Sequence, residues 1–289
     1  MAIQTAGRLY VVATPIGNLG DLSPRAREIL QTCSLIAAED TRHTGILLKH
    51  FGIATPQLSL HDHNERQRVG EIVERLRQGA AVALVSDAGT PAISDPGFEL
   101  VRAAAAAGVE IIAVPGPCAA IAALSIGGLP TDRFCFEGFL PARGAARRKR
   151  LGELAGESRT LVLYEAPHRV RETLEDCVAA FGGERVAVVA REITKMHETT
   201  YRGTLSELLE RAAAEADFSR GEIVLAVTGA PQQADDESGA DGHGGALDRV
   251  LKALLAELPL KQAARLAAVI TGSRDNETYK RALQLKQPL

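Results

Sequence analysis

Short apolar segments alternate with helix-like segments from residue 9 to about residue 230, and this alternation constrains the fold more than any other feature of the chain. The pattern is typical of α/β proteins, in which helices connect the strands of a sheet. Most of the apolar segments lack a two-residue period, which predicts sheets covered by helices on both faces. Helices are expected to start where a capping side chain precedes a proline, at Ser23-Pro24 and Asp95-Pro96. The predicted strands are 9–14, 35–39, 81–86, 111–114, 161–165, 186–190 and 223–227.

Two changes in composition divide the chain. Its 289 residues are enough for two domains of about 150 residues each. Turn-forming residues at 114–117 precede an alanine-rich helix that begins at Cys118. We therefore expect an N-terminal α/β domain over residues 1–115 and a second α/β domain over residues 116–230. The polar, glycine-rich segment 231–245 predicts a flexible linker.

Residues 246–289 are expected to form a small helical module. Apolar periodicity predicts helices over 247–257, 260–270 and 276–285, and the last two, separated by Thr271-Gly272, resemble a helix–turn–helix pair. The module carries a net charge of +4, whereas the rest of the chain carries −7. Nucleic-acid contact and a helical hairpin that packs on the body of the protein are the two alternatives for this module.

Signs of membrane insertion, secretion and metal binding are missing from the sequence. No apolar segment approaches the ~18 residues of a membrane helix, and the first seven residues lack the pattern of a secretory signal. The prediction is a cytoplasmic protein without a membrane partner. The four cysteines form no C-x-x-C pair, which argues against disulfides or a zinc knuckle. His61-Asp62-His63 has no third ligand with matching spacing, so no metal is expected.

The loop over residues 86–97 is the most informative stretch of the chain. Its small residues, two prolines and two glycines predict an unusual backbone at the carboxyl end of a strand, where open α/β sheets bind ligands. Asp87 is suited to accept hydrogen bonds from an amine or a ribose. The alternative is that Asp87 is a turn residue and that Asp95 caps a helix.

A second loop, residues 37–44, places two carboxylates, a guanidinium and an imidazole directly after a strand. This loop, which contains Glu39, Asp40 and Arg42, thus brings acidic, basic and anion-binding groups together within one turn. The alternative is that Asp40 or Thr41 caps a helix while the charged side chains that follow are solvated.

A basic cluster lies within a protein that is acidic overall. Such a density of positive charge predicts binding to the phosphates of a polyanion such as RNA. The alternative is a solvated helix face. The cluster contains no acidic residue and consists of Arg143, Arg147, Arg148, Lys149 and Arg150.

Four segments, in their order along the chain, resemble the tetrapyrrole methylase superfamily and, within it, the ribosomal RNA small subunit methyltransferase I group. The resemblance covers about residues 8–230, and the tail from 258 to 285 resembles the small C-terminal module of that group. Two segments are highly specific to the group and two are shared more widely. They are LVSDAGTPAISDPG (84–97) and AEDTRHT (38–44), then TPIGNLGDL (14–22) and VPGPCAAIAAL (114–124).

The resemblance implies two α/β domains with the ligand cleft between them, followed by the helical module. It also implies S-adenosylmethionine as the methyl donor and a homodimer. The reaction implied is 2′-O-methylation of a cytidine ribose in 16S rRNA, either free or within the small ribosomal subunit. By position, the donor contacts of the group fall on Pro15, Asp87, Thr90, Cys118 and Ala119, and less specifically on Tyr164, Glu165, Thr228 and Gly229.

Methyl transfer from a sulfonium to a ribose oxygen mostly requires alignment of the two in a dry cleft. A base or a cation near the hydroxyl should help, because a ribose hydroxyl is a poor nucleophile. Glu39, Asp40 and Arg42 are therefore the candidate catalytic residues, with no roles assigned among them.

Three alternatives stay open at this point. A methyltransferase acting on a corrin or porphyrin precursor shares the fold and the donor, but has little use for the basic cluster. A non-enzymatic RNA-binding module leaves the loop over residues 86–97 without a purpose. A nucleotide hydrolase would need a lysine-containing phosphate motif, and the loop over residues 14–21 does not contain one.

Overall fold

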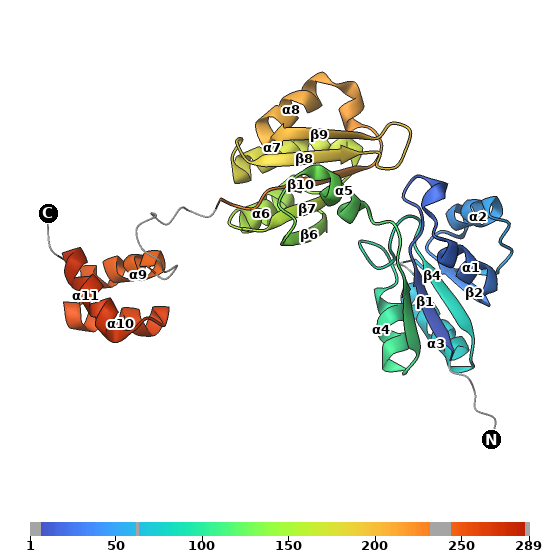
Figure 1. Ribbon diagram of the computed structural model, residues 1–289, viewed down its shortest axis with the longest axis horizontal. Helices are drawn as coiled ribbons and strands as arrows, with labels where there is room; N and C mark the ends of the chain where they lie inside the picture. The colour runs from blue at the N-terminus through green and yellow to red at the C-terminus, as the bar shows by residue number, and fades with distance from the viewer. Residues whose placement is uncertain (1–6, 62–63, 232–243, 287–289) are drawn as a thin grey trace. The chain divides into compact units, whose positions relative to one another are not determined.

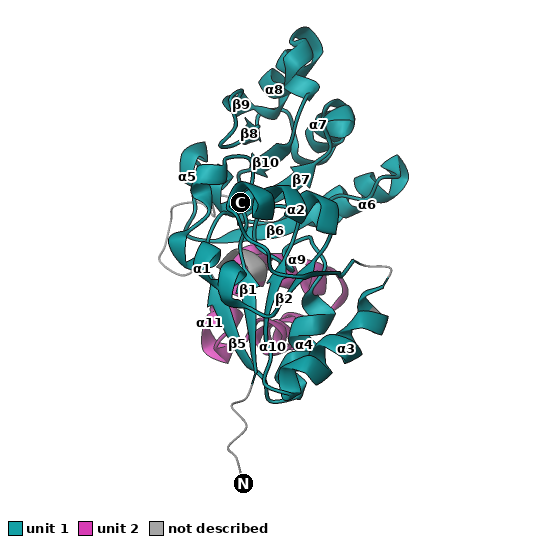
Figure 2. Cartoon of the chain, turned by 90° about the vertical axis from the view of Figure 1, so that its right-hand side faces the viewer, with its two compact units in different colours: residues 1–230 teal, residues 231–289 magenta. Residues whose placement is uncertain are grey.

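The computed structural model describes residues 7–61, 64–231 and 244–286 (Figure 1). They form two compact units, one ending at Ala230 and one beginning at Pro231, which Figure 2 shows in different colours. Among the described residues, no helix is both long and apolar enough to cross a membrane.

The first half of the larger unit is a five-stranded sheet with four helices. The elements are β1 (Arg8–Val12), α1 (Pro24–Thr32), β2 (Leu35–Ala38), α2 (Thr41–His50), β3 (Gln57–Ser59), α3 (Glu65–Arg77), β4 (Ala81–Val85), α4 (Phe98–Ala106) and β5 (Glu110–Val114). The strand order is β3-β2-β4-β1-β5, and every pairing is parallel, so all the strands end at one edge. Helices α1 and α2 bury Leu30 and Leu48 in one apolar cluster, and α3 and α4 bury Ile72 and Leu100 in another. The prediction that helices cover both faces of the sheet is confirmed.

The second half of this unit is a mixed sheet. The elements are α5 (Ala119–Gly127), β6 (Phe134–Phe139), α6 (Gly144–Leu154), β7 (Thr160–Glu165), α7 (Val170–Phe181), β8 (Val186–Arg191), β9 (Thr199–Thr204), α8 (Leu205–Ala214) and β10 (Ile223–Val227). The strand order is β6-β7-β10-β8-β9. Strands β6 and β7 are parallel, whereas β10 runs antiparallel to both β7 and β8. Helices α6, α7 and α8 pack in one apolar cluster and α5 packs in another.

All seven predicted strands are present, and three further strands, β3, β6 and β9, were not predicted. These three lie at sheet edges. One side of an edge strand lacks a neighbouring strand, so its sequence need not be a continuous apolar run. The sequence of β9, TTYRGT, illustrates this, because only Tyr201 in it is buried.

The two predicted helix starts have different outcomes. Ser23 caps α1 by accepting the N–H of Ala26, and Pro24 is the first helical residue, as predicted. The predicted start at Asp95-Pro96 is wrong, because α4 begins at Phe98. The buried carboxylate of Glu65 on α3 accepts the N–H groups at the start of α4 instead, with distances of 3.1 Å from Gly97 and from Glu99. A cap supplied by a distant helix leaves no local sequence signal.

The smaller unit consists of α9 (Gly244–Glu257), α10 (Leu260–Thr271) and α11 (Asp275–Lys286). These helices agree with the three predicted from periodicity. Gly272, with φ of 68°, ends α10, and a core that includes Leu251 and Ala267 holds the helices together. Most of the predicted linker lies at 232–243, outside the described residues, as do Asp62 and His63.

Candidate active site

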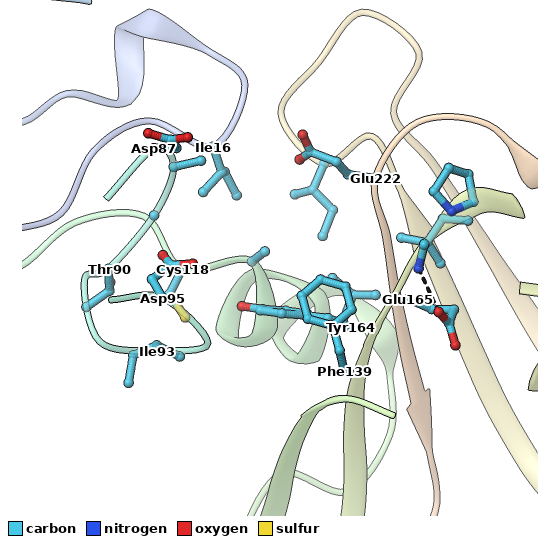
Figure 3. A pocket seen from close by; sticks show the side chains of 18 of the residues that line it. Ile16, Asp87, Thr90, Ile93, Asp95, Cys118, Phe139, Tyr164, Glu165 and Glu222 are labelled. Carbon is cyan, nitrogen blue, oxygen red and sulfur yellow. Dashed lines mark hydrogen bonds between the residues drawn. The ribbon is translucent and has the colours of Figure 1, made fainter. Parts of the chain in front are cut away.

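A pocket with a volume of about 420 Å³ lies in the larger unit, where the strands of the first sheet end (Figure 3). Small-molecule sites typically enclose ~300–1,000 Å³. The loops after β1, β2 and β4 form one wall. The other wall consists of the start of α5, the ends of β6 and β7, the loop after β8 and the start of β10.

Backbone hydrogen bonds hold the loop after β4. Thr14 and Gly89 exchange two of them, of 2.9 and 3.0 Å, which tie this loop to the loop after β1. Thr90 Oγ1 donates to the carbonyl oxygen of Pro117 at 3.0 Å. Gly89 has φ of 82°, and a Cβ there would lie 3.3 Å from Ile16 Cγ2. A side chain at position 89 would therefore be both strained and crowded.

Crossed hydrogen bonds orient two acidic residues at the ends of β2 and β4. The backbone N–H of Asp87 donates to Glu39 Oε2 at 3.3 Å, and the N–H of Asp40 donates to Asp87 Oδ1 at 3.0 Å. Glu39 and Asp87 both line the pocket. They meet because β2 and β4 are parallel neighbours, so that their carboxyl ends are adjacent.

Asp40 and Arg42 lie beside this wall rather than in the lining. Asp40 caps α2 by accepting the N–H of Arg42 at 2.8 Å, as the alternative interpretation of this loop expected. Arg42 Nη2 also contacts Asp40 Oδ2 at 2.7 Å, and this guanidinium holds the pKa of the Asp40 carboxyl well below its usual range. The Arg42 side chain is 90% exposed, so it is open to an external ligand.

Larger side chains form the second wall (Figure 3). The hydroxyl of Tyr164 accepts the N–H of Ala120 at 3.2 Å, and burial raises its pKa, so the hydroxyl stays neutral. Glu165 lines the pocket, but its buried carboxylate accepts hydrogen bonds from Thr173 Oγ1 at 2.5 Å and from the N–H of Ala166 at 2.8 Å. Through these contacts the Glu165 carboxylate helps to hold the structure of this wall. Cys118 and Ala119 join this wall at the start of α5.

The structure brings seven of the predicted donor-binding and catalytic residues into one pocket lining: Glu39, Asp87, Thr90, Cys118, Ala119, Tyr164 and Glu165. Pro15 lies next to the lining residue Ile16. Thr228 and Gly229 are not in this lining and belong to a smaller pocket of about 210 Å³. The physical reason is the direction of β10, which is antiparallel to β7, so that its first residues and not its last lie at the site.

Several lining residues were not predicted. Glu222 and Val224 were missed because the direction of β10 is set by its neighbours, and Phe139 because β6 was not recognised as a strand. Ile193 and Ile16 carry no chemical signature that would single them out. Asp95 lines the pocket instead of capping a helix. It could have been predicted as a site residue, because it lies in the AISDPG segment of the loop that the sequence marks as ligand-binding.

The fold buries or pairs some residues of the basic cluster and leaves the others exposed. The Arg147 side chain is only 3% exposed, and its Nε donates to Asp176 at 2.7 Å, so the prediction that Arg147 binds phosphate is wrong. Arg147 shares a helix face with Leu151 and Leu154, which are buried. Arg150 pairs with Glu137 at 2.7 Å and with Glu153 at 3.1 Å. Residues of the cluster whose side chains remain exposed are Arg143, Arg148 and Lys149.

The pocket is acidic. Among the described residues that line it, none is Lys, Arg or His, whereas five are acidic: Glu39, Asp87, Asp95, Glu165 and Glu222. Lys195 contacts this lining from outside, with its Nζ 3.2 Å from Glu222 and 2.9 Å from Glu192. Such a lining favours a ligand that carries positive charge over one that carries phosphates. In the described parts of the chain, no group of three or more His, Cys, Asp or Glu side chains is arranged to hold a metal ion.

Comparison with known sequences identifies the family. Residues 8–209 match the profile of the tetrapyrrole (corrin/porphyrin) methylases. The chain belongs to this family. Residues 241–286 match the profile of the RsmI C-terminal HTH domain, which corresponds to the smaller unit of this methylase.

Two full-length relatives of this methylase are named ribosomal RNA small subunit methyltransferase I. The protein from Pseudomonas aeruginosa is 55% identical over 283 residues, which is 97% of this chain and 98% of the relative. The protein from Escherichia coli O157:H7 is 52% identical over 283 residues, covering 98% of this chain and 97% of the relative.

Solved structures of more distant methylases share the fold. Uroporphyrin-III-C-methyltransferase from Thermus thermophilus matches with a TM-score of 0.54 and 21% identity, covering 77% of this chain and 94% of that one. Cobalt precorrin-4 methyltransferase, a cobalamin biosynthetic enzyme, matches with a TM-score of 0.56 and 20% identity, covering 76% of this chain and 94% of that one. Both matches leave out part of the chain.

Proposed function

We propose that this methylase transfers a methyl group from S-adenosylmethionine to the 2′-oxygen of a cytidine ribose in the 16S rRNA of the small ribosomal subunit. The observation that carries the proposal is the 55% identity over 97% of the chain to a protein named for methylation of that RNA. The likeness to the corrin and porphyrin methyltransferases of known structure, at about 20% identity, supports the fold alone.

The pocket fits the donor. S-adenosylmethionine supplies a methyl group on a positively charged sulfur, and it also carries an ammonium group. An acidic lining without a basic residue among its described members suits these charges. Asp87, Thr90, Cys118, Ala119 and Tyr164 are proposed to hold the donor, with Pro15 and Glu165 supporting the walls.

The residues of the first wall can act on the hydroxyl that accepts the methyl group. Glu39 is the candidate catalytic residue that lines the pocket, and its carboxylate is proposed to accept the hydroxyl proton. Asp40 positions Arg42 through their ion pair. The exposed guanidinium of Arg42 is proposed to hold an RNA phosphate near the pocket.

Exposed cations are proposed to bind the RNA backbone. They are Arg143, Arg148 and Lys149 near the start of α6, together with the basic surface of the smaller unit. We further propose that the enzyme is a cytoplasmic homodimer, as the family resemblance implies. Free 16S rRNA and the assembled small subunit are both candidate substrates.

The test is an incorporation assay with S-adenosylmethionine labelled on its methyl group. Small ribosomal subunits, naked 16S rRNA and a porphyrin precursor are offered separately, and the labelled nucleotide is mapped. Label on the 2′-oxygen of a cytidine is expected. Label on a base would overturn the proposed acceptor atom, and label on the porphyrin precursor alone would overturn the RNA substrate. Denatured enzyme serves as the blank.

A further inference from the structure

A β-bulge in β6 determines which face Phe139 occupies. Phe136 pairs with Val162 and Gly138 pairs with Leu163, so Glu137 is an extra residue in this edge strand. Side chains alternate along a regular strand, which would place Phe136 and Phe139 on opposite faces. The bulge reverses the alternation after Glu137.

The aromatic contacts agree with this reversal. The Phe136 and Phe139 rings both contact Tyr164 edge-on, with centroid distances of 5.0 and 5.6 Å. Tyr164 and Phe139 line the pocket and lie together on one side of it in Figure 3, while Asp87 and Thr90 lie on the other. The bulge therefore aims Phe139 at the active site.

Several contacts hold the bulge in this form. Gly138 is buried with φ of 61°, and a Cβ there would lie 2.8 Å from Ser94 Oγ in the loop after β4. The Glu137 carboxylate is bound by Arg150 at 2.7 Å. Leu140 on the other side of Phe139 is 3% exposed in the core of the second half. These contacts hold the backbone on both sides of Phe139, yet the residue is 57% exposed.

An uncovered, rigidly aimed aromatic ring in a pocket wall is suited to stack on a planar ligand. RNA-binding proteins use single aromatic side chains in this way to hold bases of unpaired nucleotides. The exposed cations Arg143, Arg148 and Lys149 begin only four residues after Phe139. An RNA strand whose phosphates bind these cations would bring its bases to the Phe139 side of the pocket.

We propose that Phe139 is the stacking platform for the base of the nucleotide that receives the methyl group. This rests on the proposed function, because it needs an RNA substrate. The adenine of the donor is also a planar aromatic ring. The proposal assigns Phe139 to the RNA base because the exposed cations follow this residue closely in the chain and the acidic, small-residue wall lies opposite.

The test compares Phe139→Leu, Phe139→Tyr and Phe134→Leu in the methylation assay. Phe134 is a matched control, since it is on the same strand, is 38% exposed and lies outside the lining. Phe139→Leu is expected to raise the KM for RNA about tenfold, while the donor affinity measured by calorimetry stays unchanged. Phe139→Tyr keeps an aromatic ring and is expected to have the KM of the wild type. Phe134→Leu is expected to match the wild type in both measurements.

Three results would overturn the assignment. Loss of donor affinity in Phe139→Leu would show that the ring stacks on the adenine of the donor. Unchanged kinetics with RNA would show that Phe139 does not stack on the RNA base. A change in the mass of the assembly on sedimentation would make Phe139 part of a subunit interface. Failure of the proposed function is recognised separately, because the wild-type enzyme would then not methylate RNA in the same assay.

Discussion

The two walls of the pocket are built differently. The first wall consists of short loops from a parallel sheet, fixed by backbone hydrogen bonds such as those between Thr14 and Gly89. The second wall comes from a mixed sheet and presents large side chains such as Tyr164 and Phe139, whose positions depend on packing. The comparison teaches that local sequence patterns can mark the loops of one wall of a site, while the residues of the other wall are recognised only from strand direction and packing.

The largest expected effect concerns the packing that supports the second wall. Arg147→Met should lower the free energy of unfolding by about 3–5 kcal/mol, because it removes the buried partner of Asp176 and leaves that largely buried carboxylate only the exposed Arg148, at 3.6 Å. The measurement is urea denaturation. Arg148→Met is the matched control on the same helix, since the Arg148 side chain is 60% exposed, and should change stability by less than about 0.5 kcal/mol. Equal effects would show that burial of Arg147 does not matter.

The first wall should be sensitive to a change of backbone. Gly89→Val is expected to weaken donor binding at least about a hundredfold in calorimetry, or about 2.7 kcal/mol, while the protein stays folded by circular dichroism. Gly108→Val is the control for strain alone, because Gly108 also has positive φ, at 70°, but a Cβ there has open space. Retained donor affinity in Gly89→Val would remove this loop from the donor site.

The exposed cations near the start of α6 offer a test of RNA contact beside the second wall. Replacing Arg143, Arg148 and Lys149 with Gln should reduce the slope of log affinity against log salt by up to about three units, with donor affinity unchanged. Arg147 is excluded from this set because it is buried. An unaltered salt slope would mean that these side chains are only solvated.

The smallest expected effect concerns Arg42, beside the first wall. Arg42→Ala should lower turnover at least about tenfold, or about 1.4 kcal/mol in the barrier, with the melting temperature nearly unchanged. The 90% exposure of its side chain argues that the fold does not depend on it. Arg42→Lys keeps the charge but not the planar donor pair and should recover only part of the activity. A fall in melting temperature that accounts for the lost activity would make Arg42 a structural residue.

Much of the fold was predictable because its signals are local. The apolar strands, the Ser23 cap of α1 and the three helices of the smaller unit all follow from residues close together in the chain. Three of the four edge strands, β3, β6 and β9, were missed because they are not continuously apolar. The start of α4 was misplaced because its cap, Glu65, comes from α3.

The candidate site divides in the same way. The loops at Glu39 and at Asp87 could be predicted, because a cluster of charge or of small residues after a strand marks a ligand-binding edge. Thr228 and Gly229 were predicted at the site and lie elsewhere, since β10 is antiparallel to β7. Phe139 could not be found from its neighbours in sequence, because the bulge at Glu137 is visible only against the register of β7.

The sequence by itself determined the alternation of helices with the seven apolar strands and marked the loops of the first wall, because caps, turn residues and apolar periods act over a few residues. The tertiary structure decided the direction of β10, the burial of Arg147 against Asp176, and the face that Phe139 presents to the pocket. Each of these depends on a contact between residues far apart in the chain, which no local pattern encodes.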